Sequence, residues 1–331
     1  MASSNEADNR LLAEIETASA KLGEARAGLG RVIFGQDRVV ELALTAILGG
    51  GHALLVGAPG LAKTRLAVSL GRVLGLDDKR VQFTPDLMPA DILGSEVLEE
   101  GETGKRSFRF IKGPVFCQLL MADEINRASP RTQSALLQAM QEHHVTVAGS
   151  RHDLPHPFHV LATQNPIEQE GTYPLPEAQL DRFLLQIEVG YPDLEAERRI
   201  LFATTGPAEE EAKPVLTAAE LMNIQRLCRL LPVGASVANA ILTLVRSARP
   251  GSGDEFIDAH VAWGPSPRAA QALMLGVRAR ALLTGRLAPS VEDVLDLAMP
   301  ALAHRMALSF SARAEGVSLA DVITKLAGRI A

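Results

Sequence analysis

Residues 57–64 combine glycines, a lysine and a threonine in a spacing that suits a triphosphate. The segment reads Gly57-Ala58-Pro59-Gly60-Leu61-Ala62-Lys63-Thr64 and follows the apolar run 53–56. We therefore predict a strand, a glycine-bearing loop and then a helix. Backbone N–H groups of such a loop converge on phosphate oxygens, and the positive end of the helix adds a favourable field. Lys63 can reach the β- and γ-phosphates, and the Thr64 hydroxyl can bind Mg²⁺.

One residue of this segment departs from the general pattern. Ala62 stands where a second glycine is expected. An alanine is tolerable at this place if its φ is helical, because a Cβ clashes mainly when φ is positive. Arg65, the next residue after the pattern, is a further candidate for nucleotide contact. The alternative is an ordinary turn between a strand and a helix, with Lys63 on the surface.

Two acidic residues end another apolar segment. Residues 117–122 run directly into Asp123 and Glu124. A buried strand that ends at a phosphate site can place one carboxylate near Mg²⁺ and the next against a water. We predict that Asp123 holds the ion through its water shell, because Mg²⁺ takes few protein ligands. Glu124 would orient and deprotonate the attacking water. The alternative is a solvated strand end.

A third apolar segment ends in a neutral amide. Residues 159–164 lead into Asn165, which precedes Pro166. An amide at that place can hydrogen-bond the γ-phosphate or the attacking water. On its own, an asparagine before a proline is equally a turn residue.

The elements that must position these residues alternate along the chain. Apolar segments separated by helical patterns recur at 53–56, 80–84, 115–122, 158–164 and 183–189. Such alternation predicts an α/β fold with a parallel sheet and helices on both faces. Two amphipathic helices are expected before the sheet, at 9–29 and around 37–48, and Gly49-Gly50-Gly51 ends the second.

Strand patterns stop after Tyr191-Pro192. Residues 193–205 and about 217–331 carry helical periodicity only, punctuated by prolines. We predict three parts: an N-terminal helical arm over 1–30, an α/β nucleotide-binding domain over 31–192, and a smaller all-α domain over 193–331.

Composition bounds the function further. The 331 residues carry a net charge of −6, which argues against a dedicated nucleic-acid binder. Cys117 and Cys228 are far apart and are expected to be buried thiols. The start of the chain lacks the features of a signal peptide, and no apolar run is long enough for a membrane span, so we expect a cytoplasmic protein. Five histidines between 143 and 159 are interpreted as surface and turn residues.

These segments, in this order, resemble the AAA+ ATPases, and their details resemble the MoxR family. The similar stretches are 57–64, 121–130, 162–183 and 264–268, of which 165–183 is the most specific. The resemblance extends from about Val32 to about Ser309, and Ala62 looks normal for this family.

The resemblance assigns roles on the nucleotide side of the site. Lys63 and Thr64 match Walker A, and Asp123 and Glu124 match Walker B. Asn165 matches sensor 1. The stretch Gly35-Gln36 matches the backbone that lies near adenine. ATP and Mg²⁺ are therefore the implied cofactors.

The resemblance also assigns two arginines. Arg268 matches sensor 2, and Arg182 matches the arginine finger that acts on the neighbouring subunit's nucleotide. The alternative for Arg182 is an ion pair with Asp181 or Glu177, and for Arg268 a helix-capping place on the surface. Two further arginines, at positions 127 and 131, are candidates for the subunit interface.

Residues 83–113 form an insertion before Walker B. A short helix at 86–94 and a hairpin over 97–110 are predicted, with Gly101 and Gly104 in its middle. The insertion resembles the helix-2 insert of the clade that contains MoxR, the magnesium chelatases and MCM-type helicases. Such hairpins project toward a ring pore; the alternative is a solvent hairpin without a role.

The resemblance implies a Mg²⁺-dependent ATPase that works as a ring, expected to be a hexamer. Its implied task is chaperone-like remodelling or maturation of a client protein or metalloenzyme complex, with a partner that carries a von Willebrand factor A domain. The alternatives are an MCM-like nucleic-acid motor, a magnesium-chelatase-like subunit, and a nucleotide-sensing scaffold that does not hydrolyse ATP.

Overall fold

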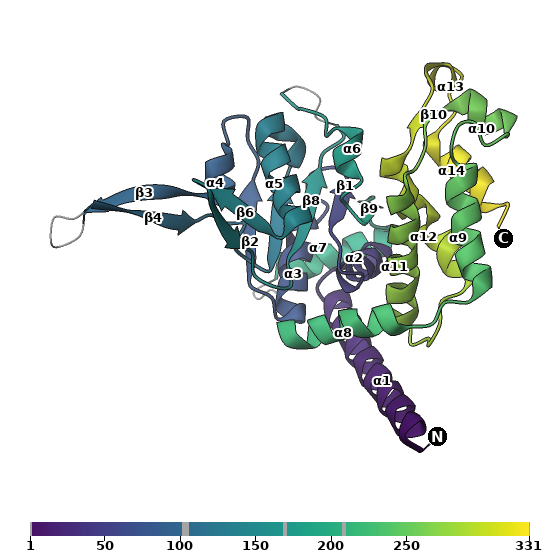
Figure 1. The fold of residues 1–331 in the computed structure, drawn as a ribbon, viewed down its shortest axis with the longest axis horizontal. Coiled ribbons are helices and arrows are strands. Elements are labelled where there is room, and N and C mark those ends of the chain that lie inside the picture. Colours follow the sequence, from purple (N-terminus) through teal and green to yellow (C-terminus); the bar gives the residue numbers. More distant parts are fainter. Residues whose placement is uncertain (1, 101–105, 168–170, 207–209, 331) are drawn as a thin grey trace.

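A five-stranded sheet lies at the centre of the first two thirds of the chain (Figure 1). The structure is a computed structural model that describes residues 2–100, 106–167, 171–206 and 210–330. All neighbouring strands are parallel, which confirms the predicted α/β fold. The spatial order is β2-β5-β8-β1-β9, and the strands are β1 (Ala53–Val56), β2 (Asp78–Gln82), β5 (Leu119–Asp123), β8 (His159–Gln164) and β9 (Leu185–Glu188).

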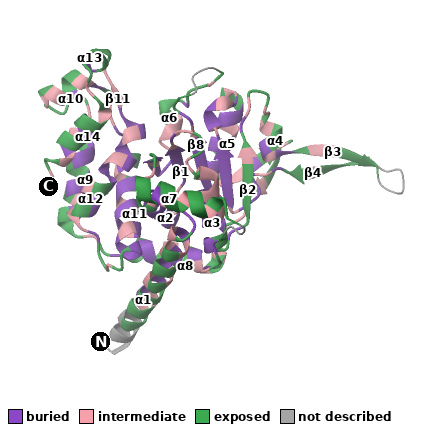
Figure 2. Cartoon of the chain, turned by 180° about the vertical axis from the view of Figure 1, so that it is seen from behind, coloured by how far each residue is buried: buried purple, intermediate pink, exposed green. Residues whose placement is uncertain are grey.

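Successive residues of the interior strand β1 are buried on opposite faces of the sheet. Leu55 of β1 belongs to one apolar cluster and Leu54 to another. Leu55 shares its cluster with α1 (Ala2–Gly30), α2 (Asp37–Leu48) and α3 (Lys63–Leu74). Leu54 shares its cluster with α5 (Pro130–Glu142), so helices cover both faces as predicted. Figure 2 shows the resulting buried centre, with exposed residues concentrated on the outer elements.

Three short helices complete this part of the chain, α4 (Pro89–Leu93), η1 (Ile125–Arg127) and α6 (Glu177–Leu180). The predicted insertion hairpin is present as β3 (Gly94–Glu100) and β4 (Arg106–Lys112), and it extends away from the body (Figure 1). Its predicted glycines, Gly101 and Gly104, lie outside the described residues.

A second hairpin was not expected from the sequence. It consists of β6 (His144–Val147) and β7 (Ser150–Asp153) and includes two of the five clustered histidines. The interpretation of these histidines as surface and turn residues is wrong for His159, which is 1% exposed at the start of β8. Its Nδ1 donates to the carbonyl of Gly51 at 2.8 Å, and its Nε2 accepts from the Gln225 amide at 3.0 Å. Both predicted buried cysteines are buried.

The C-terminal part is almost entirely helical. Its elements are α7 (Leu194–Thr204), α8 (Ala218–Leu230), α9 (Ala235–Ser247), α10 (Glu255–His260), α11 (Pro267–Leu283), α12 (Val291–Leu302), η2 (Ala303–Arg305), α13 (Phe310–Ala314) and α14 (Leu319–Ala327). The expectation of helices only is corrected by β10 (Val261–Trp263), which pairs with β11 (Ala307–Leu308). Strands of three and two residues are too short to show a period-two pattern.

No one helix within the described ranges has both the length and the apolar character for crossing a membrane; α8 and α9 meet those criteria only together, as a pair bent by 92°.

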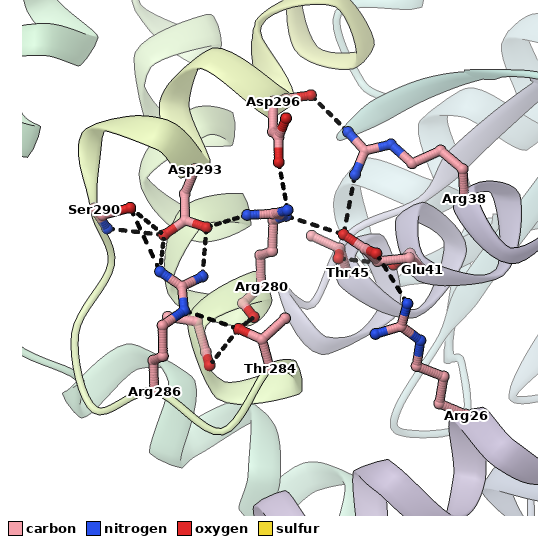
Figure 3. Close-up of polar contacts among 11 residues, drawn as sticks. Arg26, Arg38, Glu41, Thr45, Arg280, Thr284, Arg286, Ser290, Asp293 and Asp296 are labelled. Carbon is pink, nitrogen blue, oxygen red and sulfur yellow. Dashed lines mark hydrogen bonds and ion pairs between the residues drawn. The ribbon is translucent and has the colours of Figure 1, made fainter. Parts of the chain in front are cut away.

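A group of charged side chains joins the C-terminal helices to α2 (Figure 3). Arg280 of α11 donates to Glu41 of α2 at 3.0 Å and also pairs with Asp293 and Asp296 of α12. Arg26 of α1 reaches the other oxygen of Glu41 at 3.3 Å. Because Glu41 and Asp293 are buried, these contacts tie α1, α2, α11 and α12 into one packed unit.

Candidate functional site

The loop between β1 and α3 approaches its neighbours so closely that only glycine fits at its start. A Cβ on Gly57 would lie 2.4 Å from the carbonyl oxygen of Val189, at the end of β9. The Gly57 N–H donates to the Gln164 carbonyl of β8 at 3.1 Å. Gly60 has a φ of +82°, a conformation that costs glycine little. The loop is therefore held against two neighbouring strands.

Ala62 corrects one expectation. It has φ 58° and ψ 18°, in the left-handed region, and serves as the N-cap of α3. A helical φ was the condition under which an alanine would be tolerated here. The observed φ is positive instead, and a residue with a Cβ in this region is disfavoured by about 1–2 kcal/mol. The helix begins directly after it, at Lys63. The left-handed conformation of Ala62 thus turns the chain between the loop and α3, so that Lys63 and Thr64 are already the first helical residues.

Lys63 folds back over this loop. Its Nζ donates to the carbonyl oxygens of Gly57 at 2.6 Å and Ala58 at 2.8 Å. Burial lowers the pKa of Lys63, and the nearby carboxylates of Asp123 and Glu124 act in the opposite direction. The ammonium group is therefore held between the loop and the two acids.

Asp123 is buried at the end of β5, and each of its oxygens has a partner. Oδ1 accepts from the Thr163 hydroxyl at 2.6 Å, and Oδ2 accepts from Arg80 Nη2 at 2.7 Å. Thr163 and Arg80 come from the two strands that flank β5. The carboxylate is thereby fixed in orientation from both sides.

Glu124 leaves the strand in a left-handed conformation, with φ 55°. Its N–H donates to the Thr163 hydroxyl at 2.8 Å. Its Oε2 accepts from the Gln82 amide at 2.8 Å and from Arg127 Nη1 at 3.1 Å. Arg127, predicted as a candidate for the subunit interface, is thus an ion-pair partner of Glu124, whereas Arg131 is exposed on α5.

Asn165 carries a buried donor without a partner among the described residues. The residue is 5% exposed, and its Oδ1 accepts from the Ile167 N–H at 3.1 Å. Its Nδ2 is buried and has no hydrogen bond there. Since leaving a buried donor unpaired is costly, this amide is a candidate for binding a ligand oxygen.

These side chains meet around one cavity of about 390 Å³. The sequence-predicted residues that line it are Pro59, Gly60, Leu61, Ala62, Lys63, Thr64, Arg65, Asp123, Glu124 and Asn165. Sequence reasoning missed three further lining residues, Arg80, Gln82 and Thr163. The available signals were that Arg80 and Gln82 are polar residues two positions apart, on either side of Val81, and that Thr163 precedes Asn165 by two positions.

The donor set fits a triphosphate with Mg²⁺. Lys63 and the unpaired Asn165 amide supply donors for phosphate oxygens, and the loop precedes the N-terminus of α3. Thr64 and Asp123 supply the hard oxygen ligands that Mg²⁺ prefers. The site therefore has the residue types for both groups within one cavity.

Gly35 and Gln36, predicted near adenine, do not line this cavity. Gly35 has a φ of +67°, and a Cβ there would lie 2.4 Å from the Cβ of Ala196 in α7. Gln36 Nε2 donates to the Gly190 carbonyl at 2.8 Å. The stretch is packed against the connection between β9 and α7.

Arg182 and Arg268 line a second, separate cavity of about 220 Å³. Arg182 Nε donates to Gln141 Oε1 at 3.0 Å. Burial lowers the pKa of Arg182, the neighbouring Arg268 lowers it further, and Glu142 opposes both. The alternative ion pair with Asp181 is not formed, because Asp181 binds Arg305. The structure thus brings the two predicted arginines together, away from Lys63.

The chain is similar to known proteins over nearly its whole length. The pattern of the ATPase family associated with various cellular activities (AAA) matches residues 52–185, and that of the AAA lid domain matches residues 255–326. Chaperone MoxR1 of Mycobacterium tuberculosis is 40% identical over 97% of this chain and 84% of its own. Protein MoxR of Paracoccus denitrificans is 33% identical over 88% of this chain and 89% of its own.

Two further similarities span at least nine tenths of both chains. YeaC of Bacillus subtilis is 39% identical over 92% of each chain. The crystal structure of a protein from Cytophaga hutchinsonii superimposes with a TM-score of 0.89 at 35% identity and covers 98% of each chain. Together with the parallel sheet, the glycine-bearing loop and the acidic strand end, these similarities show that the chain belongs to the MoxR family of AAA+ ATPases.

Proposed function

We propose that the protein hydrolyses ATP to ADP and phosphate with Mg²⁺, and that it uses this reaction to remodel a client protein. The observation that carries the proposal is the convergence of Lys63, Asp123, Glu124 and Asn165 on one cavity. In this proposal residues 31–192 bind the nucleotide, residues 193–331 form a lid, and residues 1–30 form an arm. The cytoplasm is the compartment we propose for it.

Each side chain has a role that follows from its chemistry. Lys63 binds the β- and γ-phosphates, and the Asn165 amide, whose Nδ2 lacks a partner among the described residues, orients the γ-phosphate or the attacking water. Thr64 and Asp123 would hold Mg²⁺, which neutralises charge on the phosphates. Glu124 takes the proton of the attacking water.

A second copy of the chain supplies the remaining positive charge. Arg182 and Arg268 share a cavity that is distinct from the one around Lys63. We propose that both arginines contact the triphosphate held by the adjacent subunit. A head-to-tail interface of this kind closes into a ring, for which we propose a hexamer.

The client side of the proposal rests on the relatives. One of them is named a chaperone, which supports protein remodelling or maturation of a protein or metalloenzyme complex. We propose a von Willebrand factor A domain protein as the partner. The β3–β4 hairpin, whose apolar Phe108 is 70% exposed, is the proposed client contact.

The charges of the β3–β4 hairpin favour the client-remodelling proposal over a nucleic-acid motor. Arg106 pairs with Glu100 at 3.3 Å, and Arg109 pairs with Glu99 at 3.2 Å. Cations that are paired with carboxylates offer little net attraction to phosphates. The relatives likewise do not favour a magnesium-chelatase or helicase role.

A mixing experiment tests the shared site. Arg182→Ala alone should lower kcat by about 10³-fold, because an arginine supplied in trans contributes that much in related nucleotide hydrolysis. Glu124→Gln alone should also be inactive. In a random equal mixture, about a quarter of the interfaces would join the two wild-type groups, so activity should return. No recovery at any ratio, or full turnover by a monomer in sedimentation with ATP, would refute the proposal.

A further inference from the structure

The guanidinium group of Arg305 is buried against the segment that carries Arg182. Its side chain is 2% exposed, and Nε donates to Asp181 Oδ1 at 2.6 Å. Nη2 donates to the carbonyl of Phe183 at 2.6 Å, and Nη1 donates to the carbonyl of Leu184 at 3.1 Å. The planar fork of an arginine holds several acceptors in fixed geometry. Nη2 also donates to the Asp181 carbonyl at 3.3 Å, so Arg305 holds the backbone on both sides of Arg182.

The carboxylate of Asp181 also reaches the helix that carries Arg268. Its Oδ2 accepts from the Ser266 hydroxyl at 2.8 Å. The Ser266 oxygen in turn accepts from the N–H of Arg268 at 3.1 Å, as the N-cap of α11. The Asp181 carboxylate, next to Arg182 in the sequence, is therefore linked through Ser266 to the first turn of α11, which contains Arg268.

Electrostatics explains why such a connection is needed. Arg182 and Arg268 are like charges that line one small cavity, and Arg268 disfavours the charged form of Arg182. The carboxylate that lines this cavity, that of Asp181, is engaged by Arg305 and Ser266. Two repelling guanidinium groups keep a fixed spacing only if their backbones are held, and these contacts hold both.

We propose that Asp181 is a positioning residue, which sets the spacing of Arg182 and Arg268 so that both reach the triphosphate of the adjacent subunit together. The inference rests on the proposed shared site. A catalytic group displaced by about 1 Å can cost about 100-fold in rate, so loss of this link should lower catalysis without unfolding the chain.

The test uses the full-length protein and two variants. Asp181→Asn removes the charge that engages Arg305. Ser266→Ala keeps that charge and removes the contact between Asp181 and Ser266 together with the N-cap of α11, so the second variant keeps the test valid if the first folds poorly. Both should lower kcat at least about tenfold while KM stays within about twofold, as expected for loss of an interaction made in the transition state. The matched control is Ser318→Ala, which removes an equivalent N-cap from α14.

Mixed rings separate positioning from general damage. Subunits with Lys63→Ala still present correctly placed Arg182 and Arg268 to the adjacent subunit. In mixed rings they should therefore restore hydrolysis of the ATP that is bound by Ser266→Ala or Asp181→Asn subunits. Subunits with Arg182→Ala lack one of these arginines and should not restore hydrolysis. Rescue by neither partner, or rescue by Arg182→Ala alone, would overturn the inference. If Arg182→Ala and Glu124→Gln subunits still complement each other, only the role of Asp181 fails; if they do not, the shared site itself fails.

Discussion

The guanidinium group of Arg80 lies against the carboxylate of Asp123, with Nη2 and Nε at 2.7 and 3.1 Å from Oδ2. The two residues are on neighbouring strands, β2 and β5, and both line the cavity beside Lys63. A cation already occupies one oxygen of the acid that is proposed to hold Mg²⁺. Arg80 and the metal ion therefore compete for the same group.

Arg80→Ala should accordingly lower the Mg²⁺ concentration that half-saturates ATP hydrolysis. Loss of a hydrogen bond worth about 1 kcal/mol corresponds to a change of about fivefold. The measurement is a Mg²⁺ titration at saturating ATP. Lys79→Ala is the matched control, because Lys79 is also on β2 but donates to the Phe116 carbonyl, outside the cavity. A higher Mg²⁺ requirement in the Arg80 variant would contradict the competition.

Glu124→Gln should bind ATP with a dissociation constant within about threefold of the wild type but lose hydrolysis. The amide keeps the shape of the side chain and cannot accept the proton of water, and a general base contributes about 10²–10⁴-fold. Calorimetry gives the affinity, and single-turnover kinetics give the rate. The exposed Glu188→Gln, on β9, serves as the control. Retained turnover would remove Glu124 as the base.

Asp293→Asn should destabilise the fold strongly. Asp293 is completely buried and accepts from Arg286 at 2.6 and 2.8 Å as well as pairing with Arg280 (Figure 3). Breaking one partner of a buried pair costs about 3–5 kcal/mol, and the charge of Arg280, whose side chain is 16% exposed, stays largely buried in the variant. Urea unfolding measures the loss.

Asp296→Asn is the control for that substitution. Asp296 also pairs with Arg280, but its side chain is 48% exposed. Exposed pairs contribute about 0–1 kcal/mol. Equal losses in the two variants would show that burial of the carboxylate does not determine its contribution.

Stability should fall as the pH is lowered below about 6.5. Burial, with help from His159, lowers the pKa of His52 to about 3, and burial lowers the pKa of His159 to about 4. The unfolded chain takes up these protons near 6.5 and the folded chain does not. As the pH falls from 6.5 to the folded pKa, each histidine therefore lowers the free energy of unfolding by about 1.4 kcal/mol per pH unit.

The check is urea unfolding from pH 7.5 down to pH 4.5. His159→Gln should reduce the slope of the free energy of unfolding against pH by the contribution of one histidine, about 1.4 kcal/mol per pH unit. A slope equal to that of the wild type would show that the folded protein protonates this ring without cost.

The sequence was sufficient for the local features of the nucleotide site. The apolar run before Gly57, the acids at Asp123 and Glu124, and the polar residue Asn165 each lie within one strand and its end. Because parallel strands end at the same edge of a sheet, these residues had to meet once the strands were assigned. The same reasoning missed the left-handed φ of Ala62, since the turn depends on what packs against the loop.

Only the tertiary structure decided which distant side chains join that site and which stay apart. Arg80 reaches Asp123 because β2 lies beside β5, an order that the chain's periodicity does not specify. Asp181 meets Arg305, 124 residues further on, across the packing of two domains. Local spacing determines strands, turns and the residues at their ends. Contacts between separate elements depend on how their apolar faces pack, and that packing is a property of the whole chain.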